Sequence, residues 1–263
     1  MGAPRSYQTQ ALIIGQFKLG EVDKIVTIYT PEFGKLKAVA KGAYRPGSKL
    51  GGNVELLTHS LMMLARGRNL DIVTQSQTID AFTDLKGDLW RMACGLYVLE
   101  LVDSFTVEND ENRPLFDLLL DALRWLSQSD HSEIVLRYFE LQVLNHVGYR
   151  PELYSCAVCG SPIKPVVNFF GSGRGGVLCP RCGQKDALPS AISVDALKIL
   201  RLWQSCDYAT ARRVVLRRGL ALELEQVTHE YINYLLQREV KSVAWLHELR
   251  RSQMVVDNGR ARN

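Results

Sequence analysis

Four cysteines near the middle of the chain have the type and spacing of a metal site. Cys156 and Cys159 form one Cys-x-x-Cys pair, and nineteen residues separate it from the pair Cys179 and Cys182. A Cys-x-x-Cys turn brings two thiolates close enough to share one tetrahedral ion, and two such pairs complete the ligand set of zinc. Because four thiolates leave zinc no open coordination position, we expect one structural zinc ion, not a catalytic one.

A glycine follows each cysteine pair, in CAVCG and CPRCG, and we expect both glycines to supply the positive φ angle of a tight turn. The alternative is thiol redox chemistry, which Pro180 would suit, but redox proteins place one such pair beside a βαβ pattern that this sequence lacks. Disulfides are disfavoured because no secretory signal is visible. Cys94 and Cys206 lie in segments of helical periodicity, and we interpret them as inert thiols.

Two glycine-rich stretches resemble nucleotide-binding motifs without their context. Gly171, Gly173 and Gly176 satisfy G-x-G-x-x-G, but they lie between the cysteine pairs, without the strand and helix that this motif requires, so we expect a hairpin turn. The stretch GAYRPGSK, residues 42–49, comes close to a phosphate-binding loop but has Ser and Lys in the reverse order. Neither stretch predicts a nucleotide site.

The titratable residues show no catalytic pattern. The five histidines are scattered, and G-x-S-x-G does not occur. His229 is followed by Glu230 but lacks a second histidine four residues on, so the zinc-protease motif is absent as well. We therefore expect the protein not to be an enzyme.

The elements that must position these residues change character along the chain. The first eighty residues contain five β-branched or alternating segments separated by turns, which predicts a five-stranded barrel of the OB type. The predicted strands are residues 7–17, 23–30, 33–41, 54–65 and 70–79. From about residue 85 the apolar period becomes helical, over residues 87–104, 133–147 and 193–204 and in two further segments that contain Leu115 to Leu126 and Leu224 to Leu235.

These patterns predict an α+β protein: an N-terminal five-stranded OB-fold barrel, then a mostly helical domain with an inserted four-cysteine zinc module. We expect the OB domain at residues 1–82, the helical domain at 83–250, the zinc module at 153–188 and a flexible tail at 251–263. No apolar run reaches the length of about 18 residues that a membrane span requires.

Basic and acidic residues are unevenly distributed. Residues 1–80 hold ten Lys and Arg against six Asp and Glu, residues 81–150 six against twelve, and residues 151–220 ten against four. An acidic block between two basic blocks indicates localised anion-binding surfaces.

The predicted third strand, FGKLKAVAKG, concentrates positive charge. Side chains alternate along a strand, so Lys35, Lys37 and Lys41 should share one face. OB barrels bind nucleic acid on strands two and three and in the loops that join strands one and two and strands four and five. The candidate DNA-binding residues are Lys24, Lys35, Lys37, Lys41, Arg45, Lys49, Arg66 and Arg68.

Phe33 and Tyr44 lie among these basic residues and could stack on bases, as aromatic residues do in single-strand binding grooves. The alternative is a solvated face that protects a sheet edge from aggregation. Because contacts to the DNA backbone would dominate, we expect little sequence preference and a steep dependence on salt.

A second basic patch lies in ARRVVLRR, residues 211–218. Arg213 and Arg217 are four residues apart and would share a face if this segment is helical. A solvated helix face and a contact with DNA or an acidic protein are equal alternatives here. The patch comprises Arg212, Arg213, Arg217 and Arg218.

Three long stretches of the chain resemble the RecO family of bacterial recombinational repair proteins. They are LGEVDKIVTIYTPEFGKLKAVAKGAYRPGSKLGG, LYVLELVDSF, and HVGYRPELYSCAVCG at the start of the cysteine module. The resemblance implies an OB domain followed by a helical domain that carries a four-cysteine zinc module. The basic residues of the third strand match the DNA-binding region of the family, and this supports Lys35, Lys37, Lys41 and Arg45 as candidates.

The resemblance also implies a function, that of a recombination mediator in the bacterial cytoplasm, associated with the nucleoid. Such proteins bind single- and double-stranded DNA, anneal complementary strands and, with RecR, promote RecA loading on DNA coated by the single-strand-binding protein SSB. They also contact the acidic C-terminal tail of SSB, typically through the helical domain. The alternative is a zinc-stapled interaction scaffold whose basic face contacts acidic proteins.

Overall fold

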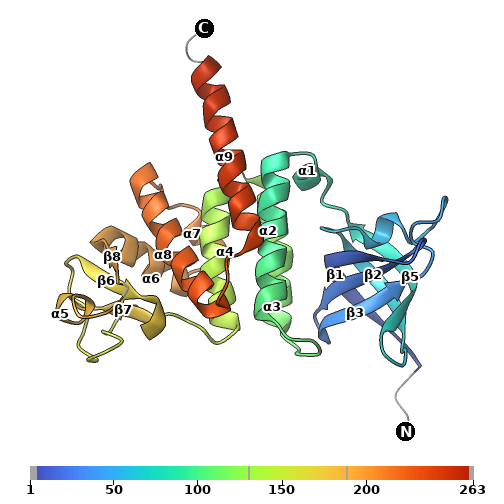
Figure 1. Ribbon diagram of the computed structural model, residues 1–263, viewed down its shortest axis with the longest axis horizontal. Coiled ribbons are helices and arrows are strands. Elements are labelled where there is room, and N and C mark those ends of the chain that lie inside the picture. The colour runs from blue at the N-terminus through green and yellow to red at the C-terminus, as the bar shows by residue number, and fades with distance from the viewer. Residues whose placement is uncertain (1–4, 130, 188, 261–263) are drawn as a thin grey trace. The chain divides into compact units, whose positions relative to one another are not determined.

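The computed structural model describes residues 5–129, 131–187 and 189–260, and the chain forms two compact units (Figure 1). Unit 1 combines Met1–Asp130 with Ser242–Asn263, and unit 2 is His131–Lys241. The first three helices follow the predicted barrel domain in sequence but belong to the same unit as the barrel. Within the described ranges, none of the helices has both the length and the apolar character that crossing a membrane requires.

Unit 1 begins with a closed five-stranded barrel, as predicted. Its strands follow the order β1-β2-β3-β5-β4, in which β3 and β5 are parallel and the other neighbouring pairs are antiparallel. The strands are β1 Ser6–Leu19, β2 Asp23–Thr30, β3 Gly34–Ala40, β4 His59–Ala65 and β5 Asp71–Asp80. β4 begins five residues later than predicted, because the short 3-10 helix η1 (Gly52–Val54) and the positive φ of 55° at Leu57 interrupt the extended chain before it.

The interior of the barrel follows from the alternation of side chains along each strand. Val26 and Ile28 of β2 and Met62 of β4 are fully buried. Ala38 and Ala40 of β3 are buried as well, and their small side chains suit the interior of a small barrel.

Helices complete unit 1: α1 Thr83–Lys86, α2 Leu89–Phe105, α3 Arg113–Gln128 and α9 Lys241–Arg260. The carboxylate of Asp88 caps α2 by accepting a hydrogen bond from the backbone of Arg91, and Asn112 caps α3 in the same way. α9 is tied to α2, since Glu100 accepts a hydrogen bond of 2.9 Å from the backbone nitrogen of Ser242. This helix continues to Arg260, into the segment for which we predicted a flexible tail.

Unit 2 encloses the cysteine module between helices. The helices are α4 Ser132–His146, α5 Pro180–Gly183, α6 Val194–Ser205, α7 Tyr208–Ala211 and α8 Arg218–Leu236. A small sheet of order β7-β6-β8 belongs to the module, with β6 Asn168–Gly171, β7 Gly176–Leu178 and β8 Ser190–Ile192. The G-x-G-x-x-G stretch forms the β6–β7 hairpin with the 3-10 turn η2 (Ser172–Arg174) at its tip, which confirms the prediction of a hairpin.

Candidate functional site

The four cysteines of the module converge on one point, as their spacing predicted. Their four sulfur atoms lie within 4.8 Å of one another, and the Sγ atoms of Cys159 and Cys179 are 3.9 Å apart. A tetrahedral zinc ion with Zn–S bonds of about 2.3 Å would place neighbouring sulfurs roughly 3.8 Å apart. The residues present therefore fit a metal ion of this geometry.

Backbone hydrogen bonds fix both cysteine turns. In the first turn, Gly160 donates its N–H to the carbonyl of Cys156, and Cys156 donates its own N–H to the carbonyl of Ser161, each at 2.8 Å. The N–H of Cys179 also points at the Cys156 sulfur, at 3.4 Å. A hydrogen bond with the Ser161 hydroxyl lowers the pKa of the Cys159 thiol to about 6, so the thiolate that a metal requires forms readily there.

The two glycines that follow the cysteine pairs have different roles. Gly160 adopts a φ of 70°, as predicted. Gly183 is not among the residues of positive φ, so the prediction for it is wrong. It ends α5 against β6, where a Cβ atom would lie 2.2 Å from Cδ2 of Phe169, and glycine is needed there for close approach.

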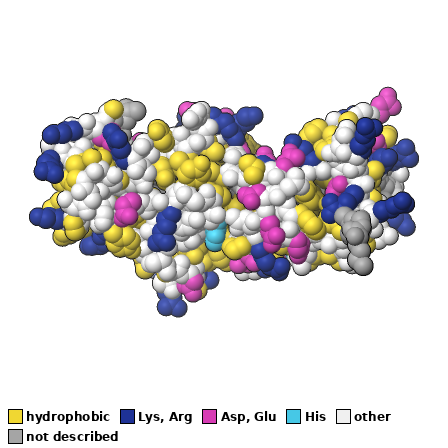
Figure 2. Space-filling view, turned by 90° about the horizontal axis from the view of Figure 1, so that it is seen from below, with side chains coloured by type: hydrophobic (Ala, Val, Ile, Leu, Met, Phe, Trp, Pro, Cys, Tyr) yellow, Lys and Arg dark blue, Asp and Glu magenta, His cyan; other side chains and the backbone are white. Residues whose placement is uncertain are grey.

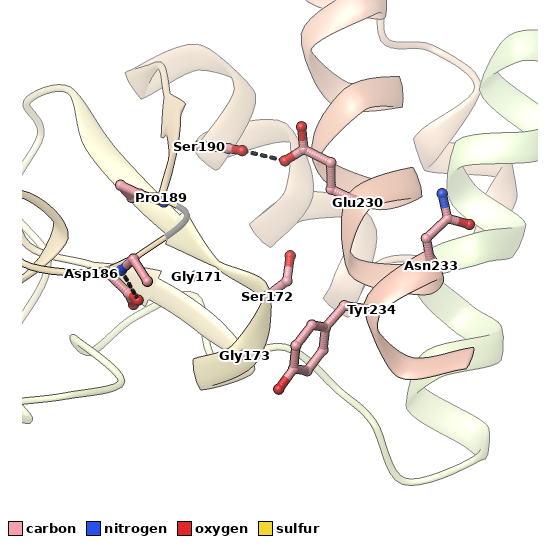
Figure 3. Close-up of a pocket in the computed structure, with 10 residues that line it drawn as sticks. Gly171, Ser172, Gly173, Asp186, Pro189, Ser190, Glu230, Asn233 and Tyr234 are labelled. Atoms are coloured by element: carbon pink, nitrogen blue, oxygen red, sulfur yellow. Dashed lines mark hydrogen bonds between the residues drawn. The ribbon is translucent and has the colours of Figure 1, made fainter. Parts of the chain in front are cut away.

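A pocket of about 670 Å³ lies between the module and α8 (Figure 3). Glu230, Asn233 and Tyr234 of α8 line one side, and Figure 3 shows Glu230 directed at Ser190, with which it forms a hydrogen bond. Asp186 on the other side pairs with Arg174 at 3.5 Å. The two acidic groups of the pocket thus already have partners within unit 2.

On unit 1, one end of the barrel's outer face is covered by helix α3. A row of paired residues crosses strands β4, β1, β2 and β3 there: His59, Leu12, Tyr29 and Lys35. Phe116 of α3 packs on this row, with its ring 6.5 Å from that of Tyr29 and 6.0 Å from that of His59. A ligand cannot reach this part of the face without displacing the helix.

The last turn of α2 and the loop after it bring negative charge to the same end. We call residues 103–111 the acidic segment because they include Asp103, Glu108, Asp110 and Glu111. The backbone N–H of Asn109 donates to the carbonyl of Lys35 at 2.9 Å, so the segment runs along β3.

Two of the predicted DNA-binding lysines are paired with this acidic segment. Lys35 is 12% exposed and donates to the backbone carbonyl of Asp103 at 2.6 Å and to its carboxylate at 3.1 Å. Lys37 forms an ion pair of 2.6 Å with Glu108, and this hydrogen bond raises the pKa of Lys37. Part of the positive charge of β3 is therefore neutralised within unit 1.

Lys24 also lies elsewhere than we expected. It is 1% exposed, and its Nζ atom donates to Glu55 at 2.7 Å and to Gln16 at 2.8 Å. Alternation along β2 directs Lys24 to the same side as the buried Val26, which leaves it no surface for a phosphate. Instead, its Nζ lies 4.9 Å from the centroid of the Tyr44 ring, so Lys24 forms a cation–π contact that helps to position this ring.

The other end of β3 is open and basic. We call residues 41–49 the basic loop; its three predicted DNA contacts, Lys41, Arg45 and Lys49, are all exposed, and none forms an ion pair with a described residue. The backbone of the loop is anchored to the β1–β2 turn, since Tyr44 donates its N–H to the carbonyl of Val22 at 2.9 Å.

Aromatic side chains accompany this positive charge. Tyr44 is 46% exposed, and Phe17 at the end of β1 is 51% exposed. We did not predict Phe17 or the exposed Lys18 beside it as contacts, although the letters FKL directly before the first turn of an OB-type barrel were a usable signal.

The β4–β5 loop holds the last two predicted contacts, Arg66 and Arg68, both exposed. The Arg66 guanidinium lies 5.0 Å from the centroid of the Tyr7 ring, and Phe33 packs on the same ring at 4.7 Å. Phe33 is therefore partly buried by Tyr7. β5 begins beside Ala38 of β3, so this loop and the basic loop flank opposite ends of that strand. Figure 2 shows Lys and Arg side chains gathered over the barrel, with Asp and Glu side chains toward the helices of unit 1.

The second basic patch of unit 2 is exposed but not helical throughout. Arg212 and Arg213 form a turn after α7, Arg217 is the N-cap of α8 and Arg218 is its first residue. The prediction that Arg213 and Arg217 share a helix face is wrong, because a loop separates them.

The chain is similar over nearly its whole length to known DNA repair proteins. The family model described as "Recombination protein O N terminal" matches residues 4–82, and "Recombination protein O C terminal" matches residues 86–244. A "DNA repair protein RecO" of Roseiflexus sp. is 40% identical over 246 residues, 94% of this chain and 87% of the relative. Proteins of the same name from Dehalococcoides mccartyi (36% identical; 95% and 98% covered) and Symbiobacterium thermophilum (34%; 93% and 98%) are similar as well.

Proposed function

The chain belongs to the RecO family of DNA repair and recombination proteins, and from this premise we propose that it is a recombination mediator. In this proposal it binds single- and double-stranded DNA with little sequence preference and anneals complementary strands in the bacterial cytoplasm, at the nucleoid. Together with RecR it promotes RecA loading on SSB-coated DNA, and it contacts the C-terminal tail of SSB. It acts without a catalytic step of its own, and so is not an enzyme.

The observation that carries the proposal is the open end of the barrel. Exposed basic side chains beside exposed aromatic rings can neutralise phosphates and stack on bases at the same time. Neutralising the charge of two strands lowers the repulsion that opposes their pairing. The proposed DNA contacts at the open end are Lys18, Lys41, Arg45 and Lys49, with Phe17 and Tyr44 as stacking residues. Arg66 and Arg68 of the β4–β5 loop are further proposed contacts at the other end of β3.

Lys35 and Lys37 enter this proposal in a conditional role. Their partners Asp103 and Glu108 occupy the positions that phosphates would take. DNA must therefore displace these carboxylates before either lysine contributes, and the exposed Lys37 is the easier of the two to release. A chain of phosphates can compete with single carboxylates because exposed ion pairs contribute only about 0–1 kcal/mol each.

We further propose that the cysteine site holds one structural zinc ion, with Cys156, Cys159, Cys179 and Cys182 as its ligands. When bound, the ion would cross-link the two turns of the module and supply no reactive position. The sulfur geometry supports this assignment.

The proposal is tested by annealing of SSB-coated complementary strands, with and without RecR, together with DNA binding at several salt concentrations. The triple variant Lys41→Gln, Arg45→Gln, Lys49→Gln should reduce the slope of log K against log salt by about 2 on single-stranded DNA. Lys198→Gln is the matched control, since this exposed lysine pairs with Asp195 on unit 2. An unchanged slope in the triple variant would refute the assignment of the open end.

A second candidate function is an interaction scaffold without direct DNA function. It is favoured by the ion pairs of Lys35 and Lys37, because they show that the β3 surface accepts carboxylates. The two functions differ in one titration. A protein that binds an SSB tail peptide but no DNA at low salt would be a scaffold.

A further inference from the structure

The second basic patch of unit 2 has no role in the zinc module or the barrel. From Tyr208 to Leu222 the chain contains four arginines and no acidic residue. All four arginine side chains are exposed. We call residues 212–218, which contain them, the arginine loop.

The arginines of the loop lie where their charge is unfavourable for the helix that follows. Helix α8 has Arg217 at its N-cap without a side-chain cap, Arg218 as its first residue and no acidic residue in its first turn. The N-terminus of a helix carries partial positive charge, so cations there are unfavourable. The two helices directly before it are capped by side chains, Ser193 on α6 and Asp207 on α7, whereas α4 and α5 of the same unit also lack a side-chain cap. Local rules are broken mainly where function requires it.

The arginine loop also exposes an apolar side chain, although apolar side chains are usually buried. Val215 lies midway between the two arginine pairs and is 89% exposed, more than any other large apolar side chain of the described residues. Its neighbours Val214 and Leu216 are half-buried and hold the loop against unit 2. Val215 is thus presented outward with two positive charges on either side.

We propose that the arginine loop is a second DNA-binding surface, on unit 2, separate from the one on the barrel. Its arginines contact phosphates on both sides of a nucleotide, and Val215 packs against the base or sugar between them. A repeating polyanion matches two separated arginine pairs, whereas a single terminal carboxylate would engage only one of them. Apolar side chains that insert beside bases are a known means of holding DNA.

The inference rests on the proposed function and extends it to the way two strands are held. An annealing protein must bring two DNA strands close together. A basic surface on each unit supplies two places for them, so each chain should bind two separate strands at once. The barrel alone would account for one.

Two measurements on the full-length, zinc-loaded protein test the proposal. The first is the salt dependence of binding to a single-stranded oligonucleotide; the second is energy transfer between donor- and acceptor-labelled, non-complementary oligonucleotides bound together. The test variants are R212Q/R213Q/R217Q/R218Q and V215S, and K198Q of the same unit is the control.

We expect the quadruple variant to lose the two-strand complex while it still binds one strand through the barrel. If all four arginines contact phosphates, the second strand should bind the wild type with a salt slope of about 3, and this second binding step should be absent in the quadruple variant. V215S should weaken the two-strand complex several-fold without changing the slope, because the lost contact is apolar. K198Q should behave like the wild type.

Three results would overturn the inference, and the first two of them leave the proposed function intact. A quadruple variant with an unchanged slope and an intact two-strand complex contradicts the inference alone. A quadruple variant that keeps the salt slope and the two-strand complex but loses binding to a Glu-rich peptide also contradicts the inference alone. That result would identify an acidic protein as the partner of the arginine loop. A wild-type protein that binds no DNA at low salt refutes both proposals together.

Discussion

The two ends of strand β3 carry similar charge and have opposite surroundings. Lys35 and Lys37, in the first half of the strand, are paired with Asp103 and Glu108 of the acidic segment. Lys41, Arg45 and Lys49, from the end of the strand onward, are exposed beside Tyr44. The sequence thus shows where basic residues are, whereas the packing of other elements decides which of them a ligand can reach.

The largest expected effect comes from the cysteine site and tests whether the open end is independent of unit 2. Cys156→Ser, or removal of zinc by a chelator, should unfold the cysteine module and destabilise unit 2, because structural zinc sites contribute folding free energy of roughly 10 kcal/mol. The barrel should still bind single-stranded DNA. Thermal unfolding, zinc content and limited proteolysis check the first part, and fluorescence anisotropy checks the second. Fully folded protein without metal would contradict the structural role.

Charge reversal at each end of β3 should have different consequences. Lys41→Glu should lower the affinity for single-stranded DNA roughly tenfold, about 1.4 kcal/mol, with little change in stability. Lys35→Glu places a second carboxylate beside Asp103 and should instead cost stability, about 1–2 kcal/mol. Urea unfolding and anisotropy titrations on both variants measure the two effects. Equal losses of affinity would mean that the covered end is as accessible as the open one.

Tyr44, one of the two aromatic residues of the open end, gives the next effect. Tyr44→Ala should weaken single-strand binding by about 1–3 kcal/mol, since the ring can stack on a base, and should leave the salt slope unchanged. Tyr234→Ala, an exposed tyrosine of unit 2, is the matched control. If both variants bind like the wild type, Tyr44 does not stack on DNA.

Releasing Lys37 from its ion pair should act in the opposite direction. Glu108→Gln removes the partner of Lys37 and should raise the affinity for single-stranded DNA by a factor of two to five, in keeping with an exposed ion pair of about 0.5–1 kcal/mol. Asp121→Asn is the control, because it breaks an exposed pair with Arg124 on α3 of the same unit. A gain in both variants would reflect the change in net charge alone.

The smallest effect is expected from pH. Burial against Phe116 lowers the pKa of His59 from its usual 6.5, so the neutral imidazole is favoured at the covered end. Buried, neutral His59 contributes fully to stability above about pH 6.5, the pKa of histidine in the unfolded chain. This contribution is lost as the pH falls below 6.5 and through the lowered pKa of His59 in the folded protein. Urea unfolding between pH 5 and 8 should show this loss, and it should be reduced in His59→Gln. A pH dependence that persists unchanged in that variant would place its origin elsewhere.

Some features could be predicted because their causes are local in sequence. The five strands follow from alternation and turn residues, and β2 has the predicted bounds, Asp23–Thr30. The burial of Lys24 was also implied by alternation, because Lys24 shares a side with Val26 and Ile28; we gave its charge more weight than its position. The two arginine pairs of the arginine loop were visible, but the break between α7 and α8 was not, because helical spacing alone does not show where a helix begins.

The sequence by itself determined the barrel, the helical remainder and the convergence of four cysteines, because period and spacing act over a few residues and fix which side chains share a face. Only the tertiary structure decided which basic residues remain accessible. Asp103 and Glu108 lie about seventy residues beyond Lys35 and Lys37, and nothing in the local pattern of either segment shows that they meet. Such pairings depend on how α2, α3 and the acidic segment pack on the barrel, since apolar burial is non-directional and brings distant charges together.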